Sequence, residues 1–278
     1  MSAMHDFRPV RTTLNFIKVK GDGSDDLVSY MDKPETQVKP FDTREVTVHD
    51  VSGHEDHFTL ERHGFQWFRH TSPFKDFDDE RLIKEVYYPE TEELLRELLG
   101  VKRVIAANHM VRRGDRVDHP AKPCHKVHFD SSISYAHQLL HDFFPGEADE
   151  LMKYRVVMVN AWRPLAPVLR DPLCIGEAHS VPPEDEVTIS IRHSTDETIP
   201  KMETNEVRYG EGHKWFYKSG MTPDDVLVFK TFDSKTDGRA RRVAHSAFEE
   251  TPSAADGLPG RQSIELRAFV FYESETWD

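Results

Sequence analysis

Residues 124–130 read Cys-His-Lys-Val-His-Phe-Asp and contain two metal-binding side chains separated by one residue. The pair Lys122-Pro123 precedes them, and a residue followed by proline avoids the helical region, so the sequence favours a strand here. In a strand, successive side chains alternate between faces, which places His128 and Asp130 on one face and Phe129 on the other. We therefore expect an imidazole and a carboxylate to converge on one point.

A third ligand is available in residues 242–248, Arg-Val-Ala-His-Ser-Ala-Phe, where His245 lies between two strand candidates. Two histidines and one carboxylate form the facial triad typical of non-haem Fe(II) oxygenases, which leaves coordination positions open. An isolated His-x-Asp pair also occurs on surfaces without any metal. A zinc cluster of Cys124, His125 and His128 is a further alternative, but the chain has no second Cys-x-x-Cys pair to complete it.

Around these motifs, short β-rich segments outnumber helical ones. Amphipathic spacing predicts helices over 78–99, 134–144 and 147–152, with a new helix starting near Pro89 and ending at Gly100. Strands are expected at 12–18, 45–51, 57–60, 64–69, 103–110, 154–161, 186–192, 214–218, 226–232 and 263–272, and a long loop at 21–41. This pattern predicts a mainly β fold with flanking helices (α+β), built as a jelly roll or cupin-like barrel whose mouth suits a metal.

Composition excludes several classes of protein. The chain of 278 residues contains no repeat and no clear linker, and we expect a single domain over 1–278. A formal net charge of -13 argues against general nucleic-acid binding. No segment is apolar enough to cross a membrane, and residues 1–8 lack the apolar stretch of a secretory signal, so we expect a cytoplasmic protein. The two cysteines make a disulfide framework improbable.

The last predicted strand carries charged residues at alternating positions. Arg261, Ser263, Glu265 and Arg267 share one face. An arginine that points into a barrel needs an anion, and the distal carboxylate of a dicarboxylate such as 2-oxoglutarate would accept a bidentate guanidinium fork and a hydroxyl hydrogen bond. The alternative is an internal ion pair between Glu265 and Arg267 that only stabilises the sheet.

Motifs along nearly the whole chain, in order, closely resemble the fungal hydroxylase/desaturase family typified by AsaB, CmcJ and GA4 desaturase. The matching blocks are Gly64-Phe65, Tyr87-Tyr88-Pro89-Glu90, Asn160-Ala161-Trp162-Arg163-Pro164-Leu165, Lys214-Trp215-Phe216-Tyr217, Phe229-Lys230, Asp233-Ser234, Ala244-His245-Ser246-Ala247-Phe248 and Arg261-x-Ser263-Ile264-Glu265-x-Arg267. Members are regarded as Fe(II)- and 2-oxoglutarate-dependent oxygenases of specialised metabolism, although some carry an older methyltransferase or cephem-methoxylase label.

The resemblance implies a double-stranded β-helix core. It makes His128, Asp130 and His245 the iron ligands, and it assigns the 2-oxoglutarate tail to Arg261, Ser263 or Arg267. Which arginine binds this tail stays open at this point.

The resemblance also favours a functional role for Arg163, which could bind a carboxylate of substrate or co-substrate. Its rival interpretation is an arginine stacked on aromatic groups at a turn. Trp162 and Phe129 complete the expected substrate-binding residues.

Together these observations predict an enzyme that uses Fe(II), 2-oxoglutarate and O2 to abstract hydrogen from a small specialised metabolite. The outcome would be hydroxylation, desaturation or ring closure, and the several arginines favour an amino-acid-derived acid as substrate. We expect a monomer or homodimer. The alternatives are a jelly-roll protein that binds metal and ligand without turning over O2, and a methyltransferase, which the absence of a glycine-rich phosphate-type loop disfavours.

Overall fold

The computed structural model describes residues 7–20, 27–37, 39–114, 121–250 and 257–278. Within them the strands are β1 Arg8–Ile17, β2 Val28–Tyr30, β3 Phe41–Asp50, β4 Phe65–Arg69, β5 Arg103–Arg113, β6 His128–Phe129, β7 Tyr154–Pro164, β8 Leu173–Gly176, β9 Glu186–Arg192, β10 Met202–Val207, β11 Trp215–Tyr217, β12 Asp225–Asp233, β13 His245–Ala247 and β14 Gln262–Thr276. The helices are α1 Leu60–His63, α2 Glu80–Leu82, α3 Tyr88–Leu99, α4 Ile133–Phe143 and α5 Ala148–Leu151. Short helical turns cover η2 Pro34–Thr36, η3 Glu55–His57, η4 Ile83–Tyr87, η5 Ala178–Ser180 and η6 Pro183–Asp185.

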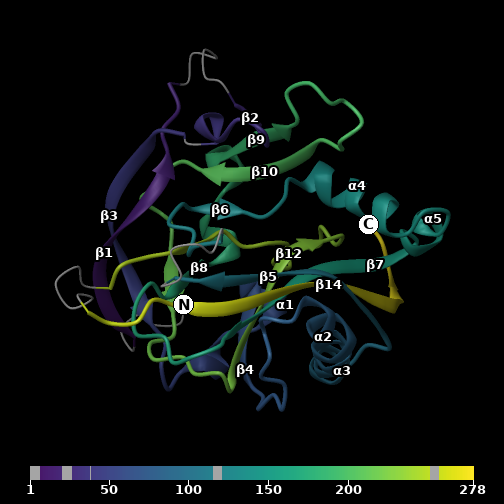
Figure 1. Ribbon diagram of the computed structural model, residues 1–278, viewed down its shortest axis with the longest axis horizontal. Coiled ribbons are helices and arrows are strands. Elements are labelled where there is room, and N and C mark those ends of the chain that lie inside the picture. The colour runs from purple at the N-terminus through teal and green to yellow at the C-terminus, as the bar shows by residue number, and fades with distance from the viewer. Residues whose placement is uncertain (1–6, 21–26, 38, 115–120, 251–256) are drawn as a thin grey trace.

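The described strands form two sheets that face one another (Figure 1). One has nine strands in the order β1-β3-β11-β8-β13-β6-β10-β9-β2, and the other has five in the order β4-β12-β7-β14-β5. Neighbouring strands run antiparallel except for the parallel pairs β3 with β11 and β2 with β9. This is the double-stranded arrangement of a jelly roll, and it confirms the predicted fold class.

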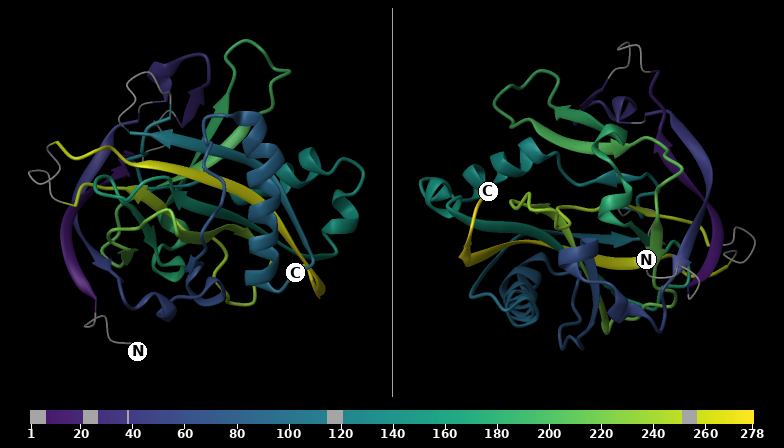
Figure 2. Two further views of the ribbon diagram at one scale, coloured as in Figure 1. Left: turned by 60° about the horizontal axis from the view of Figure 1, so that its bottom comes forward. Right: turned by 180° about the vertical axis from the view of Figure 1, so that it is seen from behind.

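A layer of aromatic and aliphatic side chains fills the space between the sheets at one end. Phe65 and Phe229 from the five-stranded sheet pack there against Ile175 and Phe216 from the nine-stranded sheet. The opposite face of the five-stranded sheet is covered by α3, whose Leu94 and Leu95 join the cluster containing Val159, Ile264 and Leu266 (Figure 2). Residues of β7 and β14 therefore alternate between the interior of the jelly roll and the helix-covered exterior.

The predicted strand at 57–60 is wrong. The chain instead forms the turn η3 and then α1, because the Thr59 side chain accepts a hydrogen bond from the backbone N–H of Arg62 and so caps the helix. Gly64 ends α1 with a φ of 86°, and a Cβ at this position would lie 2.4 Å from a methyl group of Val243. Glycine is needed here on both counts.

The helical prediction over 78–99 holds, including the helix start near Pro89 and the left-handed Gly100 at its end. Strands β8, β10 and β13 escaped prediction, and β2 lies inside the segment expected to be a loop. The expectation that residues 1–8 lack a secretory signal falls mainly on residues 1–6, which lie outside the described residues. In the described part of the chain, no helix is both long enough and apolar enough to cross a bilayer.

Candidate active site

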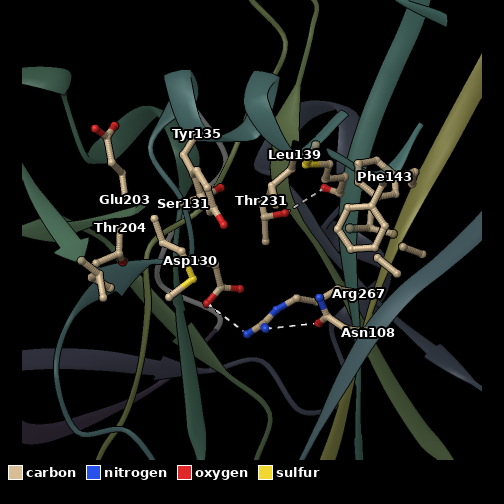
Figure 3. A pocket seen from close by; sticks show the side chains of 17 residues that line it. Asn108, Asp130, Ser131, Tyr135, Leu139, Phe143, Glu203, Thr204, Thr231 and Arg267 are labelled. Atoms are coloured by element: carbon tan, nitrogen blue, oxygen red, sulfur yellow. Dashed lines mark hydrogen bonds and ion pairs between the residues drawn. The ribbon is translucent and has the colours of Figure 1, made fainter. Parts of the chain in front are cut away.

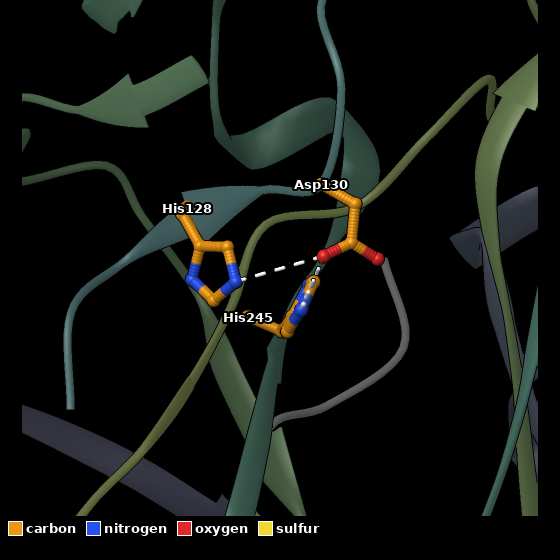
Figure 4. Close-up of side chains that lie close together, drawn as sticks. All are labelled: His128, Asp130 and His245. Carbon is orange, nitrogen blue, oxygen red and sulfur yellow. Dashed lines mark ion pairs between the residues drawn. The ribbon is translucent and has the colours of Figure 1, made fainter. Parts of the chain in front are cut away.

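Two histidines face each other across neighbouring strands of the nine-stranded sheet. His128 on β6 and His245 on β13 are register partners, and their ring centroids lie 4.4 Å apart. The Nε2 atom of each ring is 3.7 Å from Oδ1 of Asp130, which follows β6 directly (Figure 4). One ligand atom from each of the three residues lies within 4.8 Å of the others, so the group could hold a metal ion.

Surrounding groups fix the orientation of these side chains. His128 donates from Nδ1 to the carbonyl oxygen of Lys126 at 2.8 Å, which leaves the Nε2 lone pair directed at the cluster when the ring is neutral. Asp130 accepts at Oδ2 from the Asn160 side chain at 2.6 Å, so its Oδ1 is the oxygen that faces the histidines. The ring of Phe229 packs 4.9 Å from the ring of His245.

The electrostatics of the group favour a cation where the three ligand atoms meet. Burial opposes ionisation of Asp130, but Arg267 and the two histidines outweigh it and hold the pKa of this carboxyl well below its usual range. Burial, together with the nearby His128, lowers the pKa of His245 to about 3, so this ring is neutral. Burial would also lower the pKa of His128, but Cys124 and Asp130 overcome that effect and raise it to about 9, so a metal ion that binds at Nε2 displaces a proton from this ring. An anionic carboxylate beside two oriented imidazoles is the donor set that a divalent iron needs.

The zinc alternative does not match this geometry. The Sγ atom of Cys124 lies 4.0 Å from Nδ1 of His128, on the side of the ring turned away from the cluster. His125 instead pairs with Asp171, with 3.2 Å between Nε2 and Oδ1. Both side chains therefore stay outside the group of three.

The charged face of β14 points into the jelly roll, as its alternation predicted. Arg267 donates to Glu265 at 2.6 Å and lies 3.7 Å from Oδ1 of Asp130, so the expected ion pair is present and a second carboxylate is nearby. Arg267 is also the register partner of Asn160 on β7 and of Asn108 on β5. This part of β14 belongs to the immediate surroundings of Asp130.

Arg261 differs from Arg267 because no carboxylate forms an ion pair with it in the described part of the chain. It is 3% exposed, donates to the backbone oxygen of Asp171 at 2.7 Å and lies 5.4 Å above the ring of Trp162. Its Nε and the hydroxyl of Ser263 are both buried without a hydrogen-bond partner among the described residues. Burial and the neighbouring Arg112 lower the pKa of Arg261 to about 10. Buried polar groups of this kind call for a ligand, and a carboxylate would satisfy both.

The residues expected to bind substrate are not brought together. Arg163 is the register partner of Ile264 and so shares the helix-covered exterior, where its guanidinium donates to Tyr87, to His70 and to the carbonyl oxygen of Pro223. Phe129 points away from Asp130 into another core cluster, beneath the guanidinium of Arg242 at 4.5 Å. Trp162 does face the interior, but it contacts Arg261.

A cavity of about 210 Å³ opens beside Asp130 and Arg267, and we call it the chamber (Figure 3). Its walls come from β5, β7, β9, β10, β12, β14 and α4, and they include Leu139, Phe143, Met158, Ile191, Met202 and Phe269. Sequence reasoning missed most of these residues. Asn160 carried a usable signal, since a lone amide in the otherwise apolar run at 156–161 requires a polar partner.

Comparison with known proteins places the chain among enzymes. The family model described as "YDMC: Oxidoreductase/YMDC permease-like domain" matches residues 14–271. The chain is 34% identical to the hydroxylase/desaturase efuI of Hormonema carpetanum, over 99% of each chain. It is 33% identical to the alpha-ketoglutarate-dependent dioxygenase phiK of a fungal species, over 84% of this chain and 86% of the relative. The solved structure of the iron and alpha-ketoglutarate-dependent endoperoxidase NvfI has the same fold, with a TM-score of 0.84, 24% identity, and coverage of 95% of this chain and 98% of that one.

The jelly roll, the His-Asp-His group and these relatives define the class of the protein, an Fe(II)- and 2-oxoglutarate-dependent oxygenase that uses O2. Within this class the chain belongs to the oxidoreductase family that includes the fungal hydroxylases/desaturases. The resemblance in the motifs is confirmed. An oxygenase assignment disfavours both a methyltransferase and a protein that binds metal without catalysis.

Proposed function

We propose that His128, Asp130 and His245 are the iron ligands and that Arg261 and Ser263 bind the distal carboxylate of 2-oxoglutarate. The convergence of the three ligand atoms within 4.8 Å carries the first assignment. The second rests on the buried Nε atom of Arg261 and the buried hydroxyl of Ser263, which both lack a hydrogen-bond partner among the described residues. Arg112, the register partner of Ser263, adds a second positive charge near this pocket. We propose that Arg267 pairs with Glu265 and Asp130 and does not bind the co-substrate.

When bound, Fe(II) and 2-oxoglutarate supply the oxidising chemistry, in which O2 is consumed, 2-oxoglutarate is converted to succinate and CO2, and a substrate C–H bond is oxidised. The chain's own residues prepare the site for this reaction. The Lys126 carbonyl keeps the tautomer of His128 that leaves Nε2 free, and Asn160 holds Oδ2 of Asp130 so that Oδ1 faces the histidines. Phe229 packs on His245 and keeps water from its ring. The chamber beside Asp130 takes the substrate.

Anaerobic titration of the protein with Fe(II) and then with 2-oxoglutarate tests the assignment. We expect a weak visible charge-transfer band that appears only with both additions, and succinate on exposure to O2. His128→Ala and Asp130→Ala should lose iron binding, while Arg261→Met should keep iron binding and show the band only at about 10–100-fold higher 2-oxoglutarate concentration. Iron binding retained by His128→Ala and Asp130→Ala would contradict the ligand assignment.

We further propose a single oxygenase domain over 1–278, acting on a small metabolite by hydroxylation, desaturation or ring closure. The product mass separates hydroxylation, which adds one oxygen, from desaturation and ring closure, which both remove two hydrogens. That the protein is a monomer or homodimer and that it is located in the cytoplasm both remain predictions from the sequence.

A further inference from the structure

The chamber has only one basic side chain among its described lining residues, and this side chain already has partners. Arg267 donates to Glu265 at 2.6 Å and lies 3.7 Å from Asp130, and its pKa is raised because these two carboxylates outweigh the effect of burial. A substrate carboxylate in the chamber would have to compete with two fixed carboxylates for this one guanidinium. It would also lie close to both of them.

The remaining ionised group of the wall is another carboxylate. Glu203 on β10 accepts hydrogen bonds from the hydroxyls of Ser132 and Ser134 at 2.8 Å and pairs with Lys201 at 2.6 Å. Hydrogen bonds from Lys201 and from the two serines lower the pKa of Glu203 to about 2, so it stays ionised. An anion is repelled from this side of the chamber too, and a cation finds the carboxylate already paired.

Most of the wall is apolar, and one helix face supplies a continuous part of it. Tyr135, Leu139 and Phe143 follow one another at intervals of four residues along α4 and line one side of the chamber (Figure 3). Met158 and Phe269 lie on β7 and β14. The other polar groups that line the chamber are neutral hydrogen-bonding groups, such as Asn108, Thr231 and the Tyr135 hydroxyl.

The volume sets a size limit. About 210 Å³ is below the range of roughly 300–1,000 Å³ common for drug-sized ligands. A second, more polar groove of about 430 Å³ shares Tyr135 and Glu203 with the chamber and continues outward past Lys201. A compact molecule, or the reacting end of a longer one, fits these dimensions.

We propose that the substrate is an uncharged, largely apolar molecule whose reacting end enters the chamber. This rests on the proposed function, which places the iron beside Asp130, and it goes further by naming the substrate class. It replaces the expectation of an amino-acid-derived acid, because Arg163 lies on the other face of the sheet and Arg267 is paired with two carboxylates.

A matched series of probes tests the charge preference. The neutral 2-naphthalenemethanol, the anionic 2-naphthoate and the cationic 2-naphthylmethylamine share one ring system and differ mainly in charge. Calorimetry on the full chain should find the neutral probe bound at least tenfold more tightly than either ion. Equal or tighter binding of an ion, or no binding of any probe, would overturn the proposal.

Variants of α4 locate the binding. Leu139→Lys adds an unpaired cation to the wall, so 2-naphthoate should gain at least tenfold in affinity while the neutral probe loses as much. The matched control is His141→Lys, at an exposed position outside the lining, which should leave all three affinities unchanged. Thermal melts establish that both variants are folded, and the less disruptive Leu139→Phe, which reduces the volume, should weaken the neutral probe on its own. Identical affinities in Leu139→Lys, Leu139→Phe and the native chain would place the probes elsewhere and overturn the proposal.

The same measurements without metal and with Fe(II) plus 2-oxoglutarate under anaerobic conditions separate the two proposals. Failure of the iron assignment would appear as absent metal binding with the probe ranking unchanged. Failure of the substrate class would appear as a changed ranking in a protein that still binds iron and 2-oxoglutarate.

Discussion

The side-chain amide of Asn160 on β7 donates a hydrogen bond of 2.6 Å to Oδ2 of Asp130, which extends from the opposite sheet. This contact joins the two sheets at the candidate metal ligand. Asn160 is fully buried, and as the register partner of Arg267 it lies in a row of residues that surrounds Asp130. Asn160 is therefore a positioning residue, since it acts on the metal site only through Asp130.

Replacing Asn160 by Leu should weaken Fe(II) binding by about 10–100-fold, because the carboxylate then loses the donor that orients it. Anaerobic calorimetry with Fe(II) measures this loss. Met158→Leu on the same strand is the control and should retain native affinity. Asn160→Gln, which keeps the amide on a longer side chain, should recover part of the affinity. Unchanged Fe(II) binding in Asn160→Leu would contradict a positioning role for Asn160.

Replacement of Arg261, which directly precedes β14, and replacement of Arg267 on β14 should have different kinetic effects. Arg261→Met removes a charged hydrogen-bond donor worth about 1.5–3 kcal/mol, so the KM for 2-oxoglutarate should rise about 10–100-fold with Fe(II) affinity unchanged. Arg267→Met should instead change Fe(II) affinity, since Arg267 lies 3.7 Å from Oδ1 of Asp130, and change the KM for 2-oxoglutarate less. The reverse pattern would assign the co-substrate to Arg267.

Arg242 connects the segment that carries His245 to the segment that carries Asp130. Its guanidinium lies 4.5 Å above the ring of Phe129, donates to the backbone oxygen of Ser131 at 3.0 Å and forms a short ion pair with Glu186. Phe129 and Ser131 flank Asp130 on either side. Arg242 therefore fixes the backbone from which the candidate ligand projects.

Arg242→Met should consequently lower Fe(II) affinity by about tenfold, within the range for residues that support ligands from outside the coordination sphere. The neighbouring Arg241, which donates to the backbone oxygen of Asp233, supplies the control Arg241→Met, and its metal affinity should stay native. Melting temperatures of both variants separate a general loss of stability from a specific loss of metal. Equal Fe(II) affinities in the two variants would contradict the role of Arg242.

His63 should make the fold sensitive to mild acid. Burial, with a contribution from the nearby Arg62, lowers the pKa of His63 to about 4, and its Nδ1 accepts a hydrogen bond from the Thr59 backbone N–H at 3.1 Å. The unfolded chain binds this proton at about pH 6.5, so the stability from neutral His63 is complete above that pH and is lost as pH falls toward 4. Melting temperatures between pH 7.5 and 5 should decline less in His63→Gln than in the native chain. Parallel declines would show that His63 is not responsible.

Alternation along strands let the sequence predict the central part of the site. His128 and Asp130 share a face, and the interior face of β14 follows the same rule. The orientation of Arg163 could not be obtained this way, because β7 is buried on both faces and shows no alternation of polar and apolar residues. Only its pairing with Ile264 on β14 shows which face points to the helices.

Other features depend on contacts between distant segments. The chamber wall on α4 has the same amphipathic pattern as a helix packed entirely on a core, since the neighbouring Ala136 and Leu140 are buried in a core cluster against which Leu139 also packs. The roles of Asn160 and Arg242 likewise follow from hydrogen bonds across 30 and 111 positions of sequence. No local pattern encodes such pairings.

His128 and His245 are paired across two strands of one sheet, whereas the proposed substrate wall lies on a helix. The candidate metal site and the substrate preference can therefore change independently during evolution. Sheet register fixes both rings, whereas Tyr135, Leu139 and Phe143 belong to a helix connected to that sheet mainly at its Ser132 end. If the proposed site is right, a descendant enzyme can acquire a new substrate through changes on one face of α4 while His128 and His245 stay in place. For the engineer, residues 133–143 are the segment to exchange between relatives.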